Sequence, residues 1–207
     1  MTKSSSIGAE FLLKAQPTSD NPAHISKAAF PYWAYEIIDQ YFLTINKDAK
    51  FVDRVLREDT VYELQYLKKD IQASQTDKQL LLVYGTQGKI VGAERPYQHA
   101  IAISYDPQTN TLIYQNSNGV SMPDHLKDFF NGPELKDIKV IDTQLHQQRD
   151  SNSCGYFAFY NLVCLAQHVP MQEDIDIDTL RYNVDIILSD LLKVQPVTRY
   201  NRHLFNS

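Results

Sequence analysis

The sequence has few cysteines, few glycines and no long hydrophobic run. Only two of its 207 residues are cysteine, Cys154 and Cys164, and no Cys-x-x-Cys pair occurs. This excludes a disulfide scaffold and a zinc module built from clustered ligands. Gly contributes 7 residues and Pro 9, while 43% of the chain is hydrophobic. We therefore expect a globular protein rather than a low-complexity or collagen-like one.

Basic charge and membrane-spanning segments are also lacking. The chain has 25 acidic and 20 basic side chains, for a net charge of −5, which argues against nucleic acid as a partner. The longest apolar run near the start, residues 11–13, is too short for a signal-peptide core or a membrane span. We expect a cytoplasmic protein without a membrane span. Residues 1–24, which begin with a Ser-rich stretch, are expected to be disordered or weakly ordered.

Apolar periodicity and turn-forming residues predict the order of helices and strands. The predicted helices cover residues 29–42, 47–72 (with a possible break around 58–59), 121–130, 154–167 and 178–193. The predicted strands cover residues 79–85, 99–105, 111–115 and 137–142. The turn formers of residues 106–110 predict that the second and third of these strands are antiparallel. Helices, then strands, then helices indicate a single α+β domain.

Cys154 occupies an unusual place for a structural thiol. It begins a predicted buried helix, directly after a polar loop and directly before Gly155. The positive end of a helix lowers a thiol pKa, and glycine lets a substrate carbonyl or neighbouring backbone approach closely. Cys164, in the middle of the same helix, fits the usual role of a free cysteine as a small buried side chain. Position therefore favours Cys154 as a nucleophile.

A cysteine nucleophile needs a base, a group that orients the base, and donors for an oxyanion. His99 begins a predicted strand, and the neighbouring strand runs directly into Asn116, so the hairpin can bring the two side chains together. Gln148 lies six residues before Cys154, where its amide can pair with the Cys154 backbone N–H to bind an oxyanion. The predicted catalytic set is His99, Asn116, Gln148 and Cys154.

Other polar residues have simpler interpretations. His146 precedes Cys154 and is a rival base, although a loop histidine is more often a surface residue. His168 follows the helix and is expected to interact with its C-terminus. Asp174, Asp176 and Asp178 alternate with isoleucines, and Asp178 is expected to cap a helix rather than to bind metal. No metal and no cofactor is expected.

The order of these residues resembles the clan CE cysteine proteases, which include the Ulp/SENP SUMO proteases and related bacterial deubiquitinases. In that family a histidine is followed after about 17 residues by Asp or Asn, and then by Gln-x5-Cys-Gly with a helix beginning at the cysteine. Here His99 precedes Asn116 by 17 residues, and Gln148 to Gly155 reads Gln-Arg-Asp-Ser-Asn-Ser-Cys-Gly. Residues 33–42 look like the family helix beside the substrate tail channel. The resemblance implies substrate contacts for Trp33, Glu36 and Gly155.

The resemblance also implies a fold and a function. The fold is the Ulp/adenain-like cysteine protease fold, in which a central mixed sheet packs on a buried helix that starts at the nucleophile, flanked by helices. One such domain is expected over residues 25–200, followed by a tail at residues 201–207. The implied activity is a thiol isopeptidase or protease that removes ubiquitin or a ubiquitin-like modifier from proteins and acts as a monomer. A bacterial effector of this kind would be secreted into a host cell.

Three departures from the family pattern leave the modifier open. Ala100, Asn116 and Ser153 stand where the family usually has Trp, Asp and Asp. The missing Trp resembles the bacterial members and favours ubiquitin over SUMO. A neutral Asn116 stabilises an imidazolium less than a carboxylate does, which predicts a less basic His99.

Two alternatives use the same fold. YopJ-like protein acetyltransferases resemble this clan but typically have Glu at the third position, so Asn116 argues against them. An inactive modifier-binding module is the other, and the presence of His99, Gln148 and Cys154 together argues against it.

Overall fold

A computed structural model describes residues 8–14, 30, 34, 37–57, 61–74, 78–88, 97–135 and 137–194. The helices are α1 (Ala9–Leu13), α2 (Asp39–Ile45), α3 (Val61–Ser74), α4 (Asp124–Phe130), α5 (Cys154–Gln167) and α6 (Ile177–Val194), with a 3-10 turn at Pro133–Leu135. The strands are β1 (Ala49–Arg57), β2 (Gln79–Gly88), β3 (Tyr97–Asp106), β4 (Thr111–Gln115) and β5 (Lys139–Asp142). No helix in these described ranges is both long and apolar enough to cross a membrane.

The strands form one mixed sheet in the order β1-β2-β3-β4-β5. β1 is parallel to β2 and β4 is parallel to β5, while β2, β3 and β4 are antiparallel neighbours. The hairpin predicted at residues 99–115 is therefore present, with Ala102 opposite Gln115. The α+β class predicted from the sequence is confirmed.

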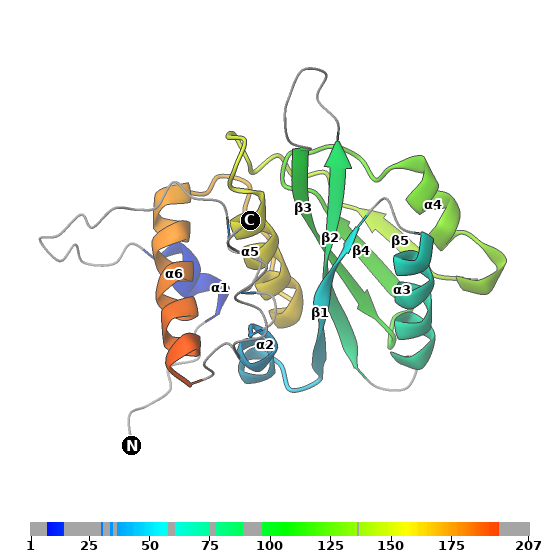
Figure 1. Ribbon diagram of the computed structural model, residues 1–207, viewed down its shortest axis with the longest axis horizontal. Coiled ribbons are helices and arrows are strands. Elements are labelled where there is room, and N and C mark those ends of the chain that lie inside the picture. The colour runs from blue at the N-terminus through cyan, green and yellow to red at the C-terminus, as the bar shows by residue number, and fades with distance from the viewer. Residues whose placement is uncertain are drawn as a thin grey trace, which may run out of the picture.

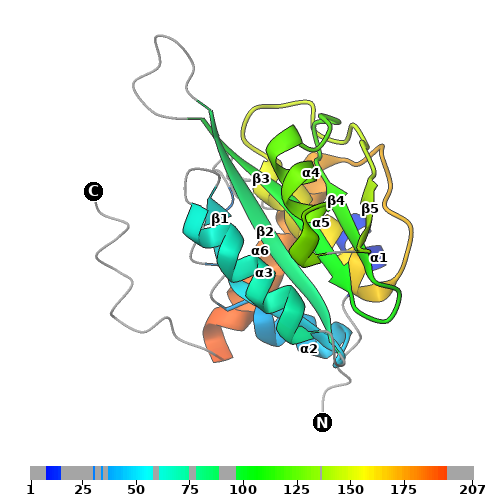
Figure 2. The same cartoon turned by 90° about the vertical axis from the view of Figure 1, so that its right-hand side faces the viewer.

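Helices cover both faces of the sheet. α5, with α1, α2 and α6, lies on one face, and α3 and α4 lie on the other (Figures 1 and 2). Leu81 and Val83 of β2 pack in the cluster with α5, whereas Leu80 and Leu82 pack in the cluster with α3 and α4. β2 is thus buried on both faces, which explains its continuous apolar run.

α5 is the central helix of its layer. Twelve of its fourteen residues are buried, as its apolar sequence predicts. The ring of Phe159 packs against Phe30, Tyr41 and Phe42, with centroids 6.1, 5.4 and 5.9 Å away. Cys154 therefore begins a helix that is fixed on every side.

Residues 49–57 were predicted to be helical, and this prediction is wrong because they form β1. Ala49 and Phe51 pack in the α5 layer, while Val52 packs in the α3 layer. This alternation is the period of a strand, and β1 pairs with β2 in parallel. Only the second part of the predicted helix, α3, is helical.

The helix predicted over residues 29–42 is wrong in its bounds. α2 begins at Asp39 and continues to Ile45. Trp33 and Glu36 lie outside the described residues, so their predicted substrate contacts stay predictions.

Two details near the ends of the described chain differ from expectation. Residues 9–13 form α1, and the Asn183 side-chain amide donates to the carbonyls of Phe11, Leu12 and Lys14 at 3.0–3.1 Å. At the start of α6 it is Asp176, not Asp178, that caps, because its carboxylate accepts the Asp178 N–H and the hydroxyl of Thr179. The proposed bounds of the domain, 25–200, remain a prediction.

Candidate active site

His99 and Asn116 meet at the end of the β3–β4 hairpin. His99 lies on β3 opposite Thr86 of β2, and Asn116 directly follows β4. The His99 Nε2 and Asn116 Oδ1 atoms are 2.7 Å apart, and both residues are 3% exposed. The juxtaposition predicted from the hairpin is present.

The surroundings of Asn116 determine which nitrogen of His99 carries the proton. Asn116 Oδ1 also accepts the backbone N–H of Asn118 at 3.3 Å, so this atom of the amide is the acceptor oxygen. His99 Nε2 must then donate to it. The buried Nδ1 is left as the basic nitrogen of the neutral ring.

Cys154 lies beside the strand residue that follows His99. Backbone N–H groups of Ala100, Gly155 and Cys154 point toward its thiol. Burial raises the pKa of the Cys154 thiol, the N–H groups lower it, and the nearby Asp150 carboxylate raises it. The net change is upward, so the lowered thiol pKa expected from the helix N-terminus is wrong: loss of hydration outweighs the helix end.

His99 is shifted in the opposite direction. Burial lowers the pKa of His99, and the hydrogen bond to Asn116 only partly opposes this. The downward shift favours the neutral imidazole of His99, and the upward shift favours the neutral thiol of Cys154. The role of His99 as the base for Cys154 stays a prediction.

Gln148 is held in the loop that leads to Cys154. Its Oε1 accepts the hydroxyl of Ser117 at 3.1 Å, and its Nε2 donates to the backbone carbonyl of Asp150 at 2.8 Å. Its backbone N–H donates to the carbonyl of Ser117 at 2.7 Å. The loop thus ties Gln148 to the residue after Asn116, and its role as an oxyanion donor stays a prediction.

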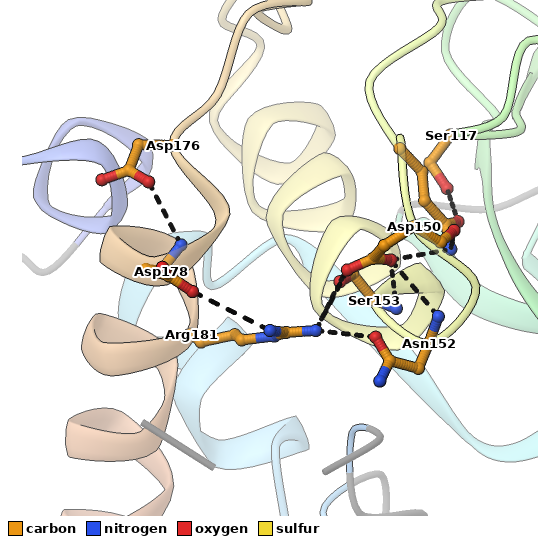
Figure 3. Close-up of polar contacts among 8 residues, drawn as sticks. Ser117, Asp150, Asn152, Ser153, Asp176, Asp178 and Arg181 are labelled. Atoms are coloured by element: carbon orange, nitrogen blue, oxygen red, sulfur yellow. Dashed lines mark hydrogen bonds and ion pairs between the residues drawn. The ribbon is translucent and has the colours of Figure 1, made fainter. Parts of the chain in front are cut away.

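The sequence analysis did not predict the ion pair between Asp150, in the loop before α5, and Arg181 on α6. The Asp150 carboxylate accepts the backbone N–H groups of Asn152 and Ser153, the Ser153 hydroxyl and Nη2 of Arg181 (Figure 3). Burial alone would raise the pKa of Asp150, but the bonds from Ser153 and Asn152 and the charge of Arg181 hold it below its ordinary value. The one feature of the sequence that pointed to a buried ion pair is Arg181 itself, a charged residue beside Leu180 on the apolar face of α6.

Gly155 leaves room for an aromatic side chain. A Cβ atom at this position would overlap Cβ of Phe30 and lie 2.9 Å from its Cγ. The Phe30 ring in turn contacts Tyr156 edge-on, with centroids 5.4 Å apart. In the structure, the group that approaches this glycine closely is therefore Phe30.

Replacing Gly155 with alanine is expected to lower the free energy of unfolding by about 1–3 kcal/mol, the usual cost of an overpacked core. The added methyl meets the stem of Phe30, which cannot swing away without moving its backbone. Urea unfolding checks this, with Ala73→Gly on α3 as a substitution of the same methyl at an exposed helical site. A Gly155→Ala protein as stable as the parent would contradict this account of the glycine.

Cys164 and His168 have structural roles, and His146 lies at the surface. Cys164 is fully buried, and burial raises its pKa to about 11 despite a bond with Tyr160, so it is the packing residue that was predicted. His168 adopts a left-handed conformation and its N–H donates to the carbonyls at the end of α5, which confirms its C-terminal role. His146 is exposed, in an isolated bridge with Asn118. Within the described ranges, no three His, Cys, Asp or Glu side chains gather as a metal site.

Comparison with known proteins identifies the fold. No family model matches the sequence, and no curated protein matches it. Among solved structures, the ASFV pS273R protease is similar with a TM-score of 0.57 and 13% identity over 78% of this chain and 68% of that one. The Chlamydia trachomatis effector protein ChlaDUB1 gives 0.52 and 12% over 87% and 95%. The SUMO protease Ulp1 gives 0.50 and 14% over 89% and 93%. The chain has a clan CE-like cysteine protease fold, as its sequence predicted.

Proposed function

We propose that this chain, which has a clan CE-like fold, is a thiol isopeptidase that removes ubiquitin or a ubiquitin-like modifier from proteins. The observation that carries the proposal is the buried bond of 2.7 Å between His99 and Asn116, next to Cys154 at the start of α5. Support comes from the shared fold, since Ulp1 is described as a SUMO protease with a catalytic cysteine.

In the proposed reaction, the Cys154 sulfur attacks the carbonyl carbon of the modifier's C-terminal glycine while Nδ1 of His99 takes the thiol proton. The carbonyl oxygen becomes an oxyanion, which the Cys154 backbone N–H and the Gln148 amide stabilise. His99 then gives its proton to the lysine nitrogen, and the C–N bond breaks to leave a thioester. Water, deprotonated by His99, attacks the thioester and releases the modifier's carboxylate and the free thiol.

Asn116 has a positioning role in this scheme. By accepting from Nε2 it keeps Nδ1 unprotonated at rest, and it holds the ring while Nδ1 gains and loses a proton. Ubiquitin is the preferred modifier in this proposal, because Ala100 stands where the family usually has Trp, a departure that resembles the bacterial members.

The proposal is tested with a panel of modifiers, including ubiquitin and SUMO, that carry a C-terminal electrophile. We expect a covalent adduct with one modifier, located on Cys154 by peptide mass spectrometry. Cys154→Ala should lose the adduct, and Cys164→Ala, which changes the buried packing thiol of the same helix, should keep it. Absence of any adduct, together with acetyl-CoA labelling of Cys154, would replace this proposal by acetyl transfer.

A further inference from the structure

We propose that Arg181 is a positioning residue for the nucleophile: it anchors the turn of residues 150–153 directly before Cys154 and compensates the carboxylate of Asp150 beside the thiol. This inference rests on the proposed function for its catalytic consequence. Its structural basis is the contact between α6 and the loop before α5 (Figure 3).

The guanidinium group of Arg181 reaches three groups of this turn. Its Nη2 lies 3.1 Å from Asp150 Oδ2, 2.8 Å from Asn152 Oδ1 and 2.8 Å from Ser153 Oγ. Arg181 is 4% exposed and Ser153 is fully buried. All three contacts are made by one nitrogen, so its two N–H groups are shared among three acceptors. Arg181 on α6 therefore holds the turn of residues 150–153 in place.

The anchored turn lies next to Cys154 and is bonded to Gln148, the two groups that the proposed reaction needs at the carbonyl. Cys154 follows Ser153 directly, and Gln148 donates to the backbone carbonyl of Asp150. A shift of the turn would displace the thiol and the oxyanion donor together. Displacements of about 1 Å near reacting atoms cost rates up to roughly 100-fold.

The charge of Arg181 has a second effect. Asp150 raises the pKa of Cys154, and Arg181 is the cation bonded to Asp150. Among the described residues, Asp178 and Asp185 on α6 and Tyr156 on α5 also lie near Arg181. The Asp178 carboxylate lies 3.9 Å from the Arg181 guanidinium. Asp185 accepts a hydrogen bond from the hydroxyl of Tyr156. The Arg181 guanidinium also lies over the ring of Tyr156.

Arg181 and Asp150 should therefore affect Cys154 in opposite directions. Without Arg181, the Asp150 anion is uncompensated and disfavours the thiolate. Without the Asp150 charge, the thiolate is favoured. A role that was only structural predicts no such opposition, because loosening the turn from either side would have a similar effect.

The test measures alkylation of Cys154 by iodoacetamide as a function of pH, with the modified peptide identified by mass spectrometry. We expect Arg181→Met to move the midpoint of the rate profile to higher pH and Asp150→Asn to move it to lower pH. Arg181→Lys keeps the charge and should leave the midpoint close to that of the parent. Lys193→Met, at an exposed position of the same helix paired with Asp190, is the matched control and should change nothing.

Turnover of the modifier substrate gives the second readout. Arg181→Met and, to a smaller extent, Arg181→Lys should lower kcat by about 10- to 100-fold with little change in KM, because the loss is in alignment rather than in substrate binding. Midpoints that move in the same direction in Arg181→Met and Asp150→Asn, or that do not move, would overturn the inference. If Arg181→Met fails to fold, Asp150→Asn and Arg181→Lys still decide it. Alkylation requires no substrate, so a chain that cleaves no modifier would refute the proposed function and leave this test valid.

Discussion

Replacing His99 with alanine is expected to lower kcat/KM for a modifier substrate by about 10⁴-fold, the upper range for loss of a general acid–base. The reason lies in the resting protonation states. Burial raises the pKa of Cys154 and lowers that of His99, so the thiol does not ionise unaided near neutral pH. Without the imidazole, both removal of the thiol proton and protonation of the leaving amine are lost.

The control for this experiment is His146→Ala. His146 is the exposed histidine closest in sequence to Cys154, and its removal should leave turnover intact. Circular dichroism and thermal unfolding would confirm that His99→Ala, which opens a small buried space, keeps its fold. Activity that survives in His99→Ala but disappears in His146→Ala would assign the base to His146 and make the triad proposed here wrong.

The second large effect is expected from Asn116. Asn116→Ala removes the acceptor of the 2.7 Å bond from His99 Nε2, so the proton can move to Nδ1 and the ring can rotate. By analogy with other triads that lose their tautomer control, kcat/KM should fall by roughly 10³-fold. The chemistry of Cys154 with a small alkylating agent at high pH should change far less, because a preformed thiolate needs no base. Full turnover in this variant would exclude Asn116 from the site.

Asn116→Asp tests the same contact through pH. The carboxylate keeps the acceptor oxygen and adds a negative charge, which raises the pKa of His99. Turnover needs the neutral ring as base, so the acid limb of kcat/KM should move to higher pH. In the parent protein, burial places that limb below 6.5, the ordinary pKa of histidine. A limb that moves to lower pH in Asn116→Asp would contradict the assignment of His99 as the base.

The sequence predicted the features of the site that depend on residues close together along the chain, namely α5 and the β3–β4 hairpin. The apolar run after Cys154 predicted α5 with both of its ends, because a helix buried on every side leaves little choice of residue. The turn formers between β3 and β4 fixed a hairpin, and the hairpin placed Asn116 beside His99. Such features depend on contacts that are close along the chain.

The parts that could not be predicted depend on distant contacts. Residues 49–57 contain charged positions among apolar ones and were assigned to a helix, and only pairing with β2 explains why they form β1. The net pKa of Cys154 depends on burial, which no spacing of residues reveals. The bond of Arg181 to Asp150 joins residues 31 positions apart, and a lone arginine on an amphipathic helix does not identify its partner.

The contact between Asn183 and α1 affects how the protein folds. Asn183 bonds to carbonyls of residues more than 165 positions earlier in the chain, and the layer that holds α5 is completed by α6. Loops of this length must close before these contacts form, and topologies rich in distant contacts fold slowly. During synthesis, α5 leaves the ribosome before α6, which packs against it. The nascent chain thus passes through a stage in which Cys154 has been made but the helical layer around α5 is incomplete.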